Sequence, residues 1–370
     1  MVQPQGYVHH NSSLVCKLNK AIYGLKQAPR AWFKTLADTL YKFGFKSTKS
    51  DVSLFVRHNS SNVTYLLVYV DDIIVTGNNS QEIETLISQL HEKFSLKDLG
   101  RFNYFLGLEA TYLPHGDLLI SQMKYAKELL LKAGMNNSKP LPTPMSTDLK
   151  LYSSDSEPFE NPTKYRSIVG ALQYLTMTRP DITFAVNRVS QFAHEPTLKH
   201  WKSVKRILRY VQGTVEHGIV FTKSTNFRIL AFADSDWGGD LEDRKSITGF
   251  CVYLDNNLIS WKSSKQTKPT PPTIYCDNQS AYLLAANPIL HSRCKHLELD
   301  LHFLRDLVNQ KSLFVAHIPS PDQVADCLTK PLSQHLFDRF RHKLRVFLCP
   351  YLSLRRGIRD KSEKSELESG

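Results

Sequence analysis

Two strand-like runs of hydrophobic residues, at positions 65–70 and 73–76, are separated by a pair of acidic residues. The runs are rich in Tyr, Val, Ile and Leu, a composition typical of β-strands. Because only Asp71 and Asp72 lie between the runs, the pattern predicts a tight hairpin that carries both carboxylates at its tip. Ordinary turns also favour Asp for local hydrogen bonding, so a purely structural turn is the alternative interpretation.

Helical spacing of hydrophobic residues predicts three helices before residue 139. The first begins near Pro29, which suits a first helical turn, and ends before Gly44. The second is capped by Asn79 or Ser80, and the third spans residues 122–133 and ends at Gly134. We interpret the apolar faces of the first two as core packing. These faces consist of Trp32, Phe33, Leu36, Leu40 and Phe43, and of Ile83, Leu86, Ile87, Leu90 and Phe94.

Residues 139–162 predict a linker, because they include five prolines among Ser, Asp and Glu. Three helices are expected after it, at residues 165–177, 182–192 and 198–211, with a break at Pro180. The third has an apolar side made of Leu198, Trp201, Val204, Ile207, Leu208 and Val211. Its opposite side is a basic ridge made of Lys199, Lys202, Lys205, Arg206 and Arg209. Such a ridge is either a solvated face or a track for a phosphate backbone.

From residue 228 the pattern changes to short strands, and three acidic residues lie at the ends of predicted elements. Asp234 and Asp277 each follow a strand, and Asp326 lies in the first turn of a last helix that is predicted from Gln323. A single acid at such a position is commonly a cap or turn residue. Three that converge at one sheet edge suggest a divalent-cation site, because hard oxygen ligands suit Mg²⁺. Two such ions about 4 Å apart promote phosphodiester cleavage.

Composition and charge are those of a globular protein that favours an anionic partner. The 370-residue chain is 41% hydrophobic and 22% charged, which excludes a largely disordered protein and allows two or three domains. The net charge of +12 and the pI of about 9.3 favour nucleic acid. The six cysteines contain no CxxC pair, so we expect neither a zinc site nor a disulfide framework. Without a signal peptide or a membrane-spanning run, we expect an intracellular protein, cytoplasmic or nuclear.

Several blocks, in order and spacing, resemble the reverse transcriptase of copia-type retrotransposon Pol polyproteins. They read QPQGYV, KLNKAIYGLKQAPRAWF, GFKSTKSDVSLF, YVDDIIVTG and FSLKDLGRFNYFLGLE. The resemblance implies that Asp71 and Asp72 bind the Mg²⁺ or Mn²⁺ ions that catalyse nucleotide addition. It also implies that residues 104–109 help to position the primer. The region near template and nucleotide would fall on Gly24, Leu25, Lys26, Gln27 and Arg30.

The C-terminal part resembles the RNase H domain of the same family. The matching blocks read ADSDW, KSITGFCVYLDNNLISWKSSKQ, YCDNQSA, NPILHSRCKHLELDLHF and VADCLTKPL. The resemblance implies that Asp234, Asp277 and Asp326 are the first, third and fourth of its four metal-binding acids. The block YRSIVGALQYLTMTRPDITFAVNRVSQF matches the segment that joins the two catalytic domains. The resemblance extends over residues 1–345.

Two departures from the family pattern predict a catalytic defect. The second RNase H acid is a Glu on a helix after Gln266, but only the seven residues 267–273, three of them proline, precede the next strand. A parallel crossover normally needs about a dozen residues or more, so we expect an uncovered apolar face and three acids in place of four. In the polymerase, a further Asp lies upstream of the block at which this chain starts. We therefore expect Asp71 and Asp72 to hold a metal only loosely.

These features predict an α/β fold class, with a palm-type α+β polymerase fragment and an RNase H-like mixed α/β domain that lacks one helix. The predicted segments are a partial reverse transcriptase at 1–139, a linker at 140–164, a helical connection at 165–222, the RNase H-like domain at 223–347 and a disordered tail at 348–370.

The favoured function is a catalytically defective Pol fragment that resembles RNA-directed DNA polymerase and RNase H. Its expected partners are RNA, DNA, RNA–DNA hybrid and dNTP, with weak binding of Mg²⁺ or Mn²⁺. Nucleic-acid contacts are expected at Lys26, Gln27, Arg30, Lys202, Lys205, Arg206 and Arg209. The alternatives are a non-catalytic nucleic-acid-binding protein of retroelement origin and the product of a decayed reading frame that does not fold stably.

Overall fold

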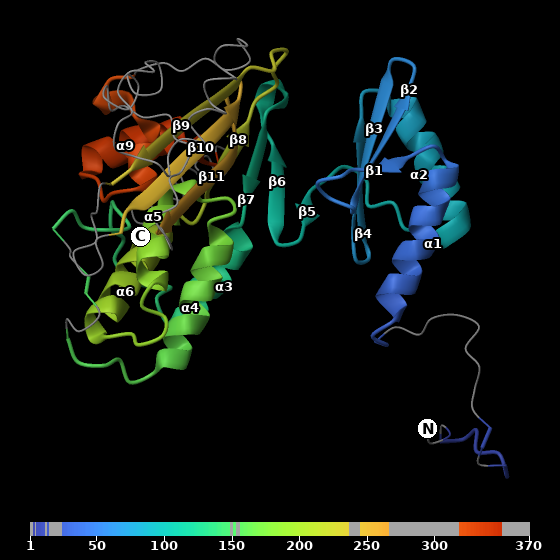
Figure 1. The fold of residues 1–370 in the computed structure, drawn as a ribbon, viewed down its shortest axis with the longest axis horizontal. Coiled ribbons are helices and arrows are strands. Elements are labelled where there is room, and N and C mark those ends of the chain that lie inside the picture. The colour runs from blue at the N-terminus through green and yellow to red at the C-terminus, as the bar shows by residue number, and fades with distance from the viewer. Residues whose placement is uncertain are drawn as a thin grey trace, which may run out of the picture. The chain divides into compact units, whose positions relative to one another are not determined.

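The chain divides into two compact units, Met1–Phe105 and Leu106–Gly370 (Figure 1). Both combine helices with antiparallel sheets, as expected for a mixed α/β chain. The predicted segment boundary at residue 139 falls inside the second unit. No helix among the described residues is long and apolar enough to cross a membrane. The computed structural model describes residues 3, 5–11, 13–14, 24–148, 151–152, 156–236, 245–265 and 318–349.

The first unit is a four-stranded antiparallel sheet with two helices packed on one face (Figure 1). Phe55 and Leu66 face each other in adjacent strands and pack against Leu36, Leu40 and Leu86 of the helices. In chain order, the elements are α1 (Ala28–Lys42), β1 (Lys46–Ser47), β2 (Leu54–Asn59), β3 (Asn62–Tyr69), β4 (Asp72–Gly77) and α2 (Ser80–Phe94). The sheet order follows the chain, β1-β2-β3-β4.

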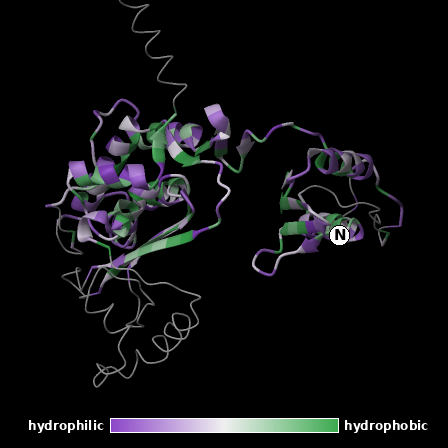
Figure 2. Ribbon diagram, turned by 90° about the horizontal axis from the view of Figure 1, so that it is seen from above, coloured by the Kyte–Doolittle hydropathy of each residue, from purple (hydrophilic) through white to green (hydrophobic). Residues whose placement is uncertain are grey.

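Local sequence accounts for the ends of both helices and confirms their predicted bounds. Pro29 lies in the first turn of α1, and Gly44 follows its C-terminus with a φ of +84°. The Asn79 side chain accepts hydrogen bonds from the backbone N–H groups of Gln81 at 3.0 Å and Glu82 at 3.2 Å, so Asn79 is the N-cap of α2. Hydrophobic and hydrophilic residues lie on the same helices, as amphipathic packing requires (Figure 2).

The second unit contains a sheet whose strands come from distant parts of the chain. Strands β6 (Leu108–Tyr112), β7 (Leu118–Ser121), β8 (His217–Phe221) and β12 (Val346–Leu348) lie in the order β12-β8-β7-β6, all antiparallel. The 3-10 helix η1 (Pro114–Gly116) joins β6 to β7, and β5 (Tyr104–Phe105) ends the first unit. Our sequence patterns predict none of β7, β8 and β12. Because Leu348 pairs with His217, the predicted tail begins inside a strand.

Four helices supply most of the core of the second unit. They confirm the four predicted helices, and Gly134 ends the first with a φ of +70°. The 3-10 helix η2 (Pro180–Ile182) occupies the predicted break. The four are α3 (Met123–Ala133), α4 (Pro162–Leu175), α5 (Thr183–Ser190) and α6 (Leu198–Gly213).

One residue of α6 contradicts the predicted apolar side. Leu198 is 37% exposed, because it is the first residue of the helix and lies beyond the neighbours that cover the later turns. Trp201 is half-buried and stacks on Phe159, with ring centroids 4.9 Å apart. The other four predicted positions, Val204, Ile207, Leu208 and Val211, are fully buried.

A second sheet and three short helical segments complete the described part of this unit. Strands β9 (Ile229–Ser235), β10 (Ile247–Leu254) and β11 (Asn257–Lys265) form an antiparallel sheet in the order β11-β10-β9. They are followed by η4 (Ser320–Asp322), η5 (Val324–Leu328) and α9 (Gln334–Lys343). The prediction of one last helix from Gln323 is wrong, because the segment is a 3-10 helix that ends at Leu328. Pro331 disfavours helical backbone in the residue before it, and the α-helix begins only at Gln334.

Several predicted features of the RNase H-like part lie outside the described residues. These are Asp277 and the shortened segment 267–273.

Candidate functional site

The acidic pair lies at the end of the β3–β4 hairpin, but only one of the two acids belongs to the turn. Tyr69 pairs with Asp72, so the two-residue tip consists of Val70 and Asp71. The prediction that both carboxylates lie in the turn is wrong, because β3 ends at Tyr69, one residue before the end of its hydrophobic run, and β4 begins at Asp72, one residue before its own run begins. Both acids are exposed. Val70 has a φ of +49°, a conformation that β-branched residues rarely adopt.

Asp72 lies on the sheet face opposite to α1 and α2. Successive strand residues alternate between faces, and Ile73 and Val75 pack against the helical core. Asp72 therefore shares the open face with Tyr65 and Tyr69, which are 43% and 52% exposed. This face presents carboxylate and phenol groups to solvent.

The fit of the hairpin to a divalent cation is partial. The carboxylate oxygens of Asp71 and Asp72 are the hard ligands that Mg²⁺ and Mn²⁺ prefer. However, the described part of the chain contains no group of three His, Cys, Asp or Glu residues that could hold a metal ion. Asp71 and Asp72 thus offer two carboxylates of the suitable ligand type, without a third such residue beside them in the described part of the chain.

The three predicted nucleic-acid contacts near the start of α1, Lys26, Gln27 and Arg30, are all exposed. Lys26 and Gln27 precede the helix, and Arg30 lies in its first turn. The Gln27 side chain makes no capping hydrogen bond, although Gln27 is the N-cap residue. These three side chains are therefore available to an external anion as well as to water.

A second pair of acids meets where β9 ends beside η5. Asp234 of β9 and Asp326 of η5 are 7% and 8% exposed. The Thr329 hydroxyl donates to Asp234 Oδ2 at 2.5 Å, and Lys330 Nζ lies 2.9 Å from Asp326 Oδ1. The Gln323 side chain anchors the start of η5 by donating to the Ala233 carbonyl at 3.0 Å. Two of the three predicted RNase H-like acids are thus brought together, and Asp277 lies outside the described residues.

Glycine at position 249 allows η5 to pack closely on β10. A Cβ atom there would lie 2.6 Å from Leu328 Cβ and 2.9 Å from Thr329 Cγ2. Gly249 is also directly opposite Asp234 in the β9–β10 register. The backbone approach that brings Asp326 toward Asp234 therefore requires a residue without a side chain at this position.

Burial dominates the electrostatics of Asp326 in this second pair. It raises the pKa of Asp326 from 3.8 to about 6, although the Lys330 ammonium acts in the opposite direction. The neighbouring Asp234 carboxylate raises it further. Two adjacent carboxylates fit a divalent cation in ligand type, but here Lys330 already supplies positive charge at one of them.

The basic ridge of α6 is only partly open. The Arg206 guanidinium donates to Thr143 Oγ1 at 2.8 Å, and Arg209 Nε donates to the Lys139 carbonyl at 2.6 Å. Burial and the nearby Arg209 charge lower the pKa of Arg206. Lys202 is exposed and Lys205 is half-exposed. The ridge borders a groove of 580 Å³ whose lining includes Met135 and Leu141.

Sequence reasoning missed a buried polar network between η2 and the end of α6. Arg179 and Asp181 are each 1% exposed and form a two-point ion pair at 2.9 and 2.8 Å. Tyr210 donates to Asp181 Oδ2 at 2.5 Å, and Arg179 also donates to the Thr214 carbonyl at 2.8 Å. The Arg179 guanidinium, the Asp181 carboxylate and the Tyr210 hydroxyl all find their hydrogen-bond partners inside the network. We therefore assign the network a structural role. The Arg-Pro-Asp sequence carries no periodic signal that could reveal it.

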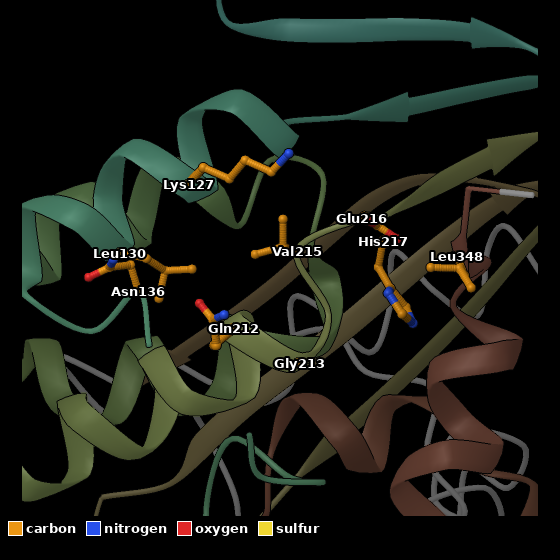
Figure 3. A pocket seen from close by; sticks show the side chains of 9 residues that line it. All are labelled: Lys127, Leu130, Asn136, Gln212, Gly213, Val215, Glu216, His217 and Leu348. Atoms are coloured by element: carbon orange, nitrogen blue, oxygen red, sulfur yellow. The ribbon is translucent and has the colours of Figure 1, made fainter. Parts of the chain in front are cut away.

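A pocket of 220 Å³ lies between α3, the end of α6 and strand β8 (Figure 3). Lys127 and Leu130 extend into it from α3, Gln212 from α6 and His217 from β8 (Figure 3). Burial, and then the Arg179 charge, lower the pKa of His217 to about 4. No predicted site residue lines this pocket.

Comparisons with known proteins identify the ancestry of the chain. The family described as "Reverse transcriptase (RNA-dependent DNA polymerase)" matches residues 1–147. An uncharacterized mitochondrial protein of Arabidopsis thaliana, AtMg00810, is 48% identical over 223 residues, which cover 60% of this chain and 92% of that protein. A putative transposon Ty5-1 protein of Saccharomyces cerevisiae is 30% identical over 78% of this chain and 93% of its own.

A longer relative extends the match over nearly the whole sequence. The retrovirus-related Pol polyprotein from transposon RE2 of Arabidopsis thaliana is 43% identical over 385 residues, or 95% of this chain. The chain belongs to the copia-type retrotransposon Pol family. This Pol segment spans about a quarter of the RE2 polyprotein, 26% of its length. The match to RE2 confirms the predicted family. No solved structure matches this chain.

Proposed function

We propose that this Pol segment binds RNA–DNA hybrid, using a palm-type first unit and an RNase H-like second unit, and that it does not cleave hybrid by itself. The observation that carries the proposal is the meeting of Asp234 and Asp326 at the end of β9 in a chain of this family. The YVDD hairpin of the first unit, with a sheet backed by two helices, supports the palm-type assignment. RNA, DNA and dNTP are the proposed partners.

The acids of both units are the proposed ligands of Mg²⁺ or Mn²⁺. Asp71 and Asp72 would contribute two carboxylates in the polymerase, and Asp234, Asp277 and Asp326 three in the RNase H-like domain. A bound divalent ion supplies charge stabilisation to phosphate oxygens during phosphoryl transfer. The chain itself positions the carboxylates, through hairpin register in the first unit and through the contact of η5 with β9 and β10 in the second.

The proposed inability to cleave hybrid rests on the segment between β11 and Asp277. Residues 267–273 contain no acid and three prolines, so the Glu of the family pattern has no counterpart there. Three carboxylates leave the metal set one ligand short. We therefore expect hybrid binding without hybrid cleavage.

The exposed lysines of α6 provide the clearest test of hybrid binding. Each phosphate contact releases counterions, so the logarithm of the binding constant falls linearly with the logarithm of salt concentration. In the double variant Lys202→Gln/Lys205→Gln, we expect weaker binding and a salt slope that is shallower by about 2. Fluorescence anisotropy with a labelled RNA–DNA hybrid measures both quantities.

The control variant is Lys97→Gln/Lys124→Gln, which removes the same charge from two exposed positions outside the ridge. An equal loss of slope in both variants would show that only net charge matters, and would remove α6 from the proposed contact surface. In a parallel assay with Mg²⁺ or Mn²⁺, any hybrid cleavage that Asp277→Asn abolishes would contradict the proposed defect.

A non-catalytic nucleic-acid-binding protein is the second candidate, favoured by the ion pair that already engages Asp326. Primer extension on an RNA template distinguishes it from a working polymerase. Extension that depends on a divalent metal and is lost in Asp71→Asn would favour the polymerase.

A further inference from the structure

Two consecutive residues after η5 each hold one acid of the second carboxylate pair. The Thr329 hydroxyl donates to Asp234, and the Lys330 ammonium pairs with Asp326 at 2.9 Å. Asp234 and Asp326 are buried residues, 7% and 8% exposed, so their desolvated charges need compensation nearby. One short segment thus provides a hydroxyl for one acid and a cation for the other.

We propose that Thr329 and Lys330 are positioning residues that hold the two carboxylates together without metal, and that the Lys330 ammonium competes with a divalent cation for Asp326. The proposal rests on the proposed function in one respect, namely that Asp234 and Asp326 are metal ligands. It adds that this site contains its own displaceable counter-ion.

The two acids and the lysine differ in how freely they can move. Asp234 lies within the β9–β10 ladder, and η5 is fixed by the Gln323–Ala233 hydrogen bond and by the close approach to Gly249. By contrast, the Lys330 side chain is 48% exposed and has a flexible stem that reaches solvent. An incoming cation can therefore displace the ammonium while the carboxylates stay in place.

The proposal predicts an effect opposite in sign to that of simple damage to the site. A unit positive charge about 4 Å from a site repels a dication, so Lys330→Gln should tighten Mn²⁺ binding by about tenfold. Lys330→Arg keeps the charge and should bind Mn²⁺ as weakly as the unmodified chain. A residue with a purely structural role would instead weaken metal binding when substituted.

The experiment measures Mn²⁺ binding to the full chain by calorimetry and by electron paramagnetic resonance of free Mn²⁺, with no activity readout needed. The variants are Lys330→Gln, Lys330→Arg, Asp326→Asn and Lys330→Gln/Asp326→Asn. Lys124→Gln, an exposed substitution on α3 with the same charge change, is the control. Circular dichroism confirms that each variant retains the fold.

Three results are distinguishable. Tighter binding in Lys330→Gln that is lost when Asp326→Asn is added supports the proposal. Binding that requires Asp326 but is unchanged in Lys330→Gln overturns the counter-ion role and leaves the proposed metal ligands intact. Binding that does not depend on Asp326 in any variant overturns the ligand assignment itself, and the counter-ion role with it.

Discussion

Val70 occupies the tip of the acidic hairpin with a φ of +49° and is 55% exposed. Left-handed backbone costs an ordinary L-residue roughly 1–2 kcal/mol, and Asn less, because its side chain can hydrogen-bond locally. We expect Val70→Asn to raise the free energy of unfolding of the first unit by about 1 kcal/mol, as measured by urea titration. Little packing is lost because the side chain is exposed.

The control for this prediction is Thr76→Asn on the same hairpin. Thr76 is exposed and is not among the positive-φ residues. Asn there should lower stability slightly, since β-propensity favours Thr. Equal changes in the two variants would mean that the conformation of Val70 stores no strain.

His217 is a residue of the second unit whose protonation links pH to stability. Burial and the Arg179 charge lower its pKa from 6.5 to about 4. The unfolded chain therefore binds this proton more tightly, so the stabilisation is complete above pH 6.5 and is lost as pH falls toward 4. The loss is at most about 3 kcal/mol, and smaller where water screens the ring.

The measurement compares the free energy of unfolding of the second unit at pH 7.5 and pH 4.5. His217→Gln should flatten the difference between the two values. His335→Gln, an exposed histidine of α9, should leave it unchanged. The same slope in His217→Gln and the unmodified chain would assign the pH dependence to other groups.

At the scale of elements, the buried Arg179–Asp181 pair ties η2 to the end of α6. Asp181→Asn leaves a guanidinium that is 1% exposed without its counter-charge. We expect a loss of about 3–5 kcal/mol in the free energy of unfolding. The double variant Arg179→Met/Asp181→Leu should recover much of that loss, because it removes both charges. Additive losses in a double-mutant cycle would show that the Arg179 and Asp181 charges do not stabilise each other.

The contact between η5 and β10 depends on Gly249. A methyl group there would overlap Leu328 Cβ, at 2.6 Å, so Gly249→Ala should lower the stability of the second unit by about 1–3 kcal/mol. Gly170→Ala on α4 is the matched control, because nothing lies within 4 Å of its added methyl group. It should raise stability by up to about 1 kcal/mol. Thermal unfolding of both variants provides the comparison.

At the scale of the whole molecule, the described residues form two main hydrophobic cores that share no residue. Each unit should therefore unfold as its own cooperative step. Calorimetry should resolve two transitions, one shifted by Val70→Asn and the other by Gly249→Ala. A single transition that both variants shift would show that the units unfold together.

Local signals were sufficient for much of the fold. Pro29, Asn79 and Gly134 act within one turn of their helices, so the bounds of α1, α2 and α3 follow from neighbouring residues alone. The pairing of β7 with β8 joins Ser121 to Gly218, and β12 joins Val346 to Ile219. Such partners are chosen by three-dimensional packing, and no short-range pattern encodes them.

The sequence by itself determined the family, the helices α1 to α6 and the identity of the candidate acids, because motif spacing and hydrophobic periodicity are properties of nearby residues. Only the tertiary structure decided that Asp72 lies in a strand and Asp71 in the turn, and that Asp326 meets Asp234. It also decided that Lys330 compensates Asp326 and that Arg206 and Arg209 are partly engaged. These outcomes depend on strand register, burial and contacts between segments far apart in the chain.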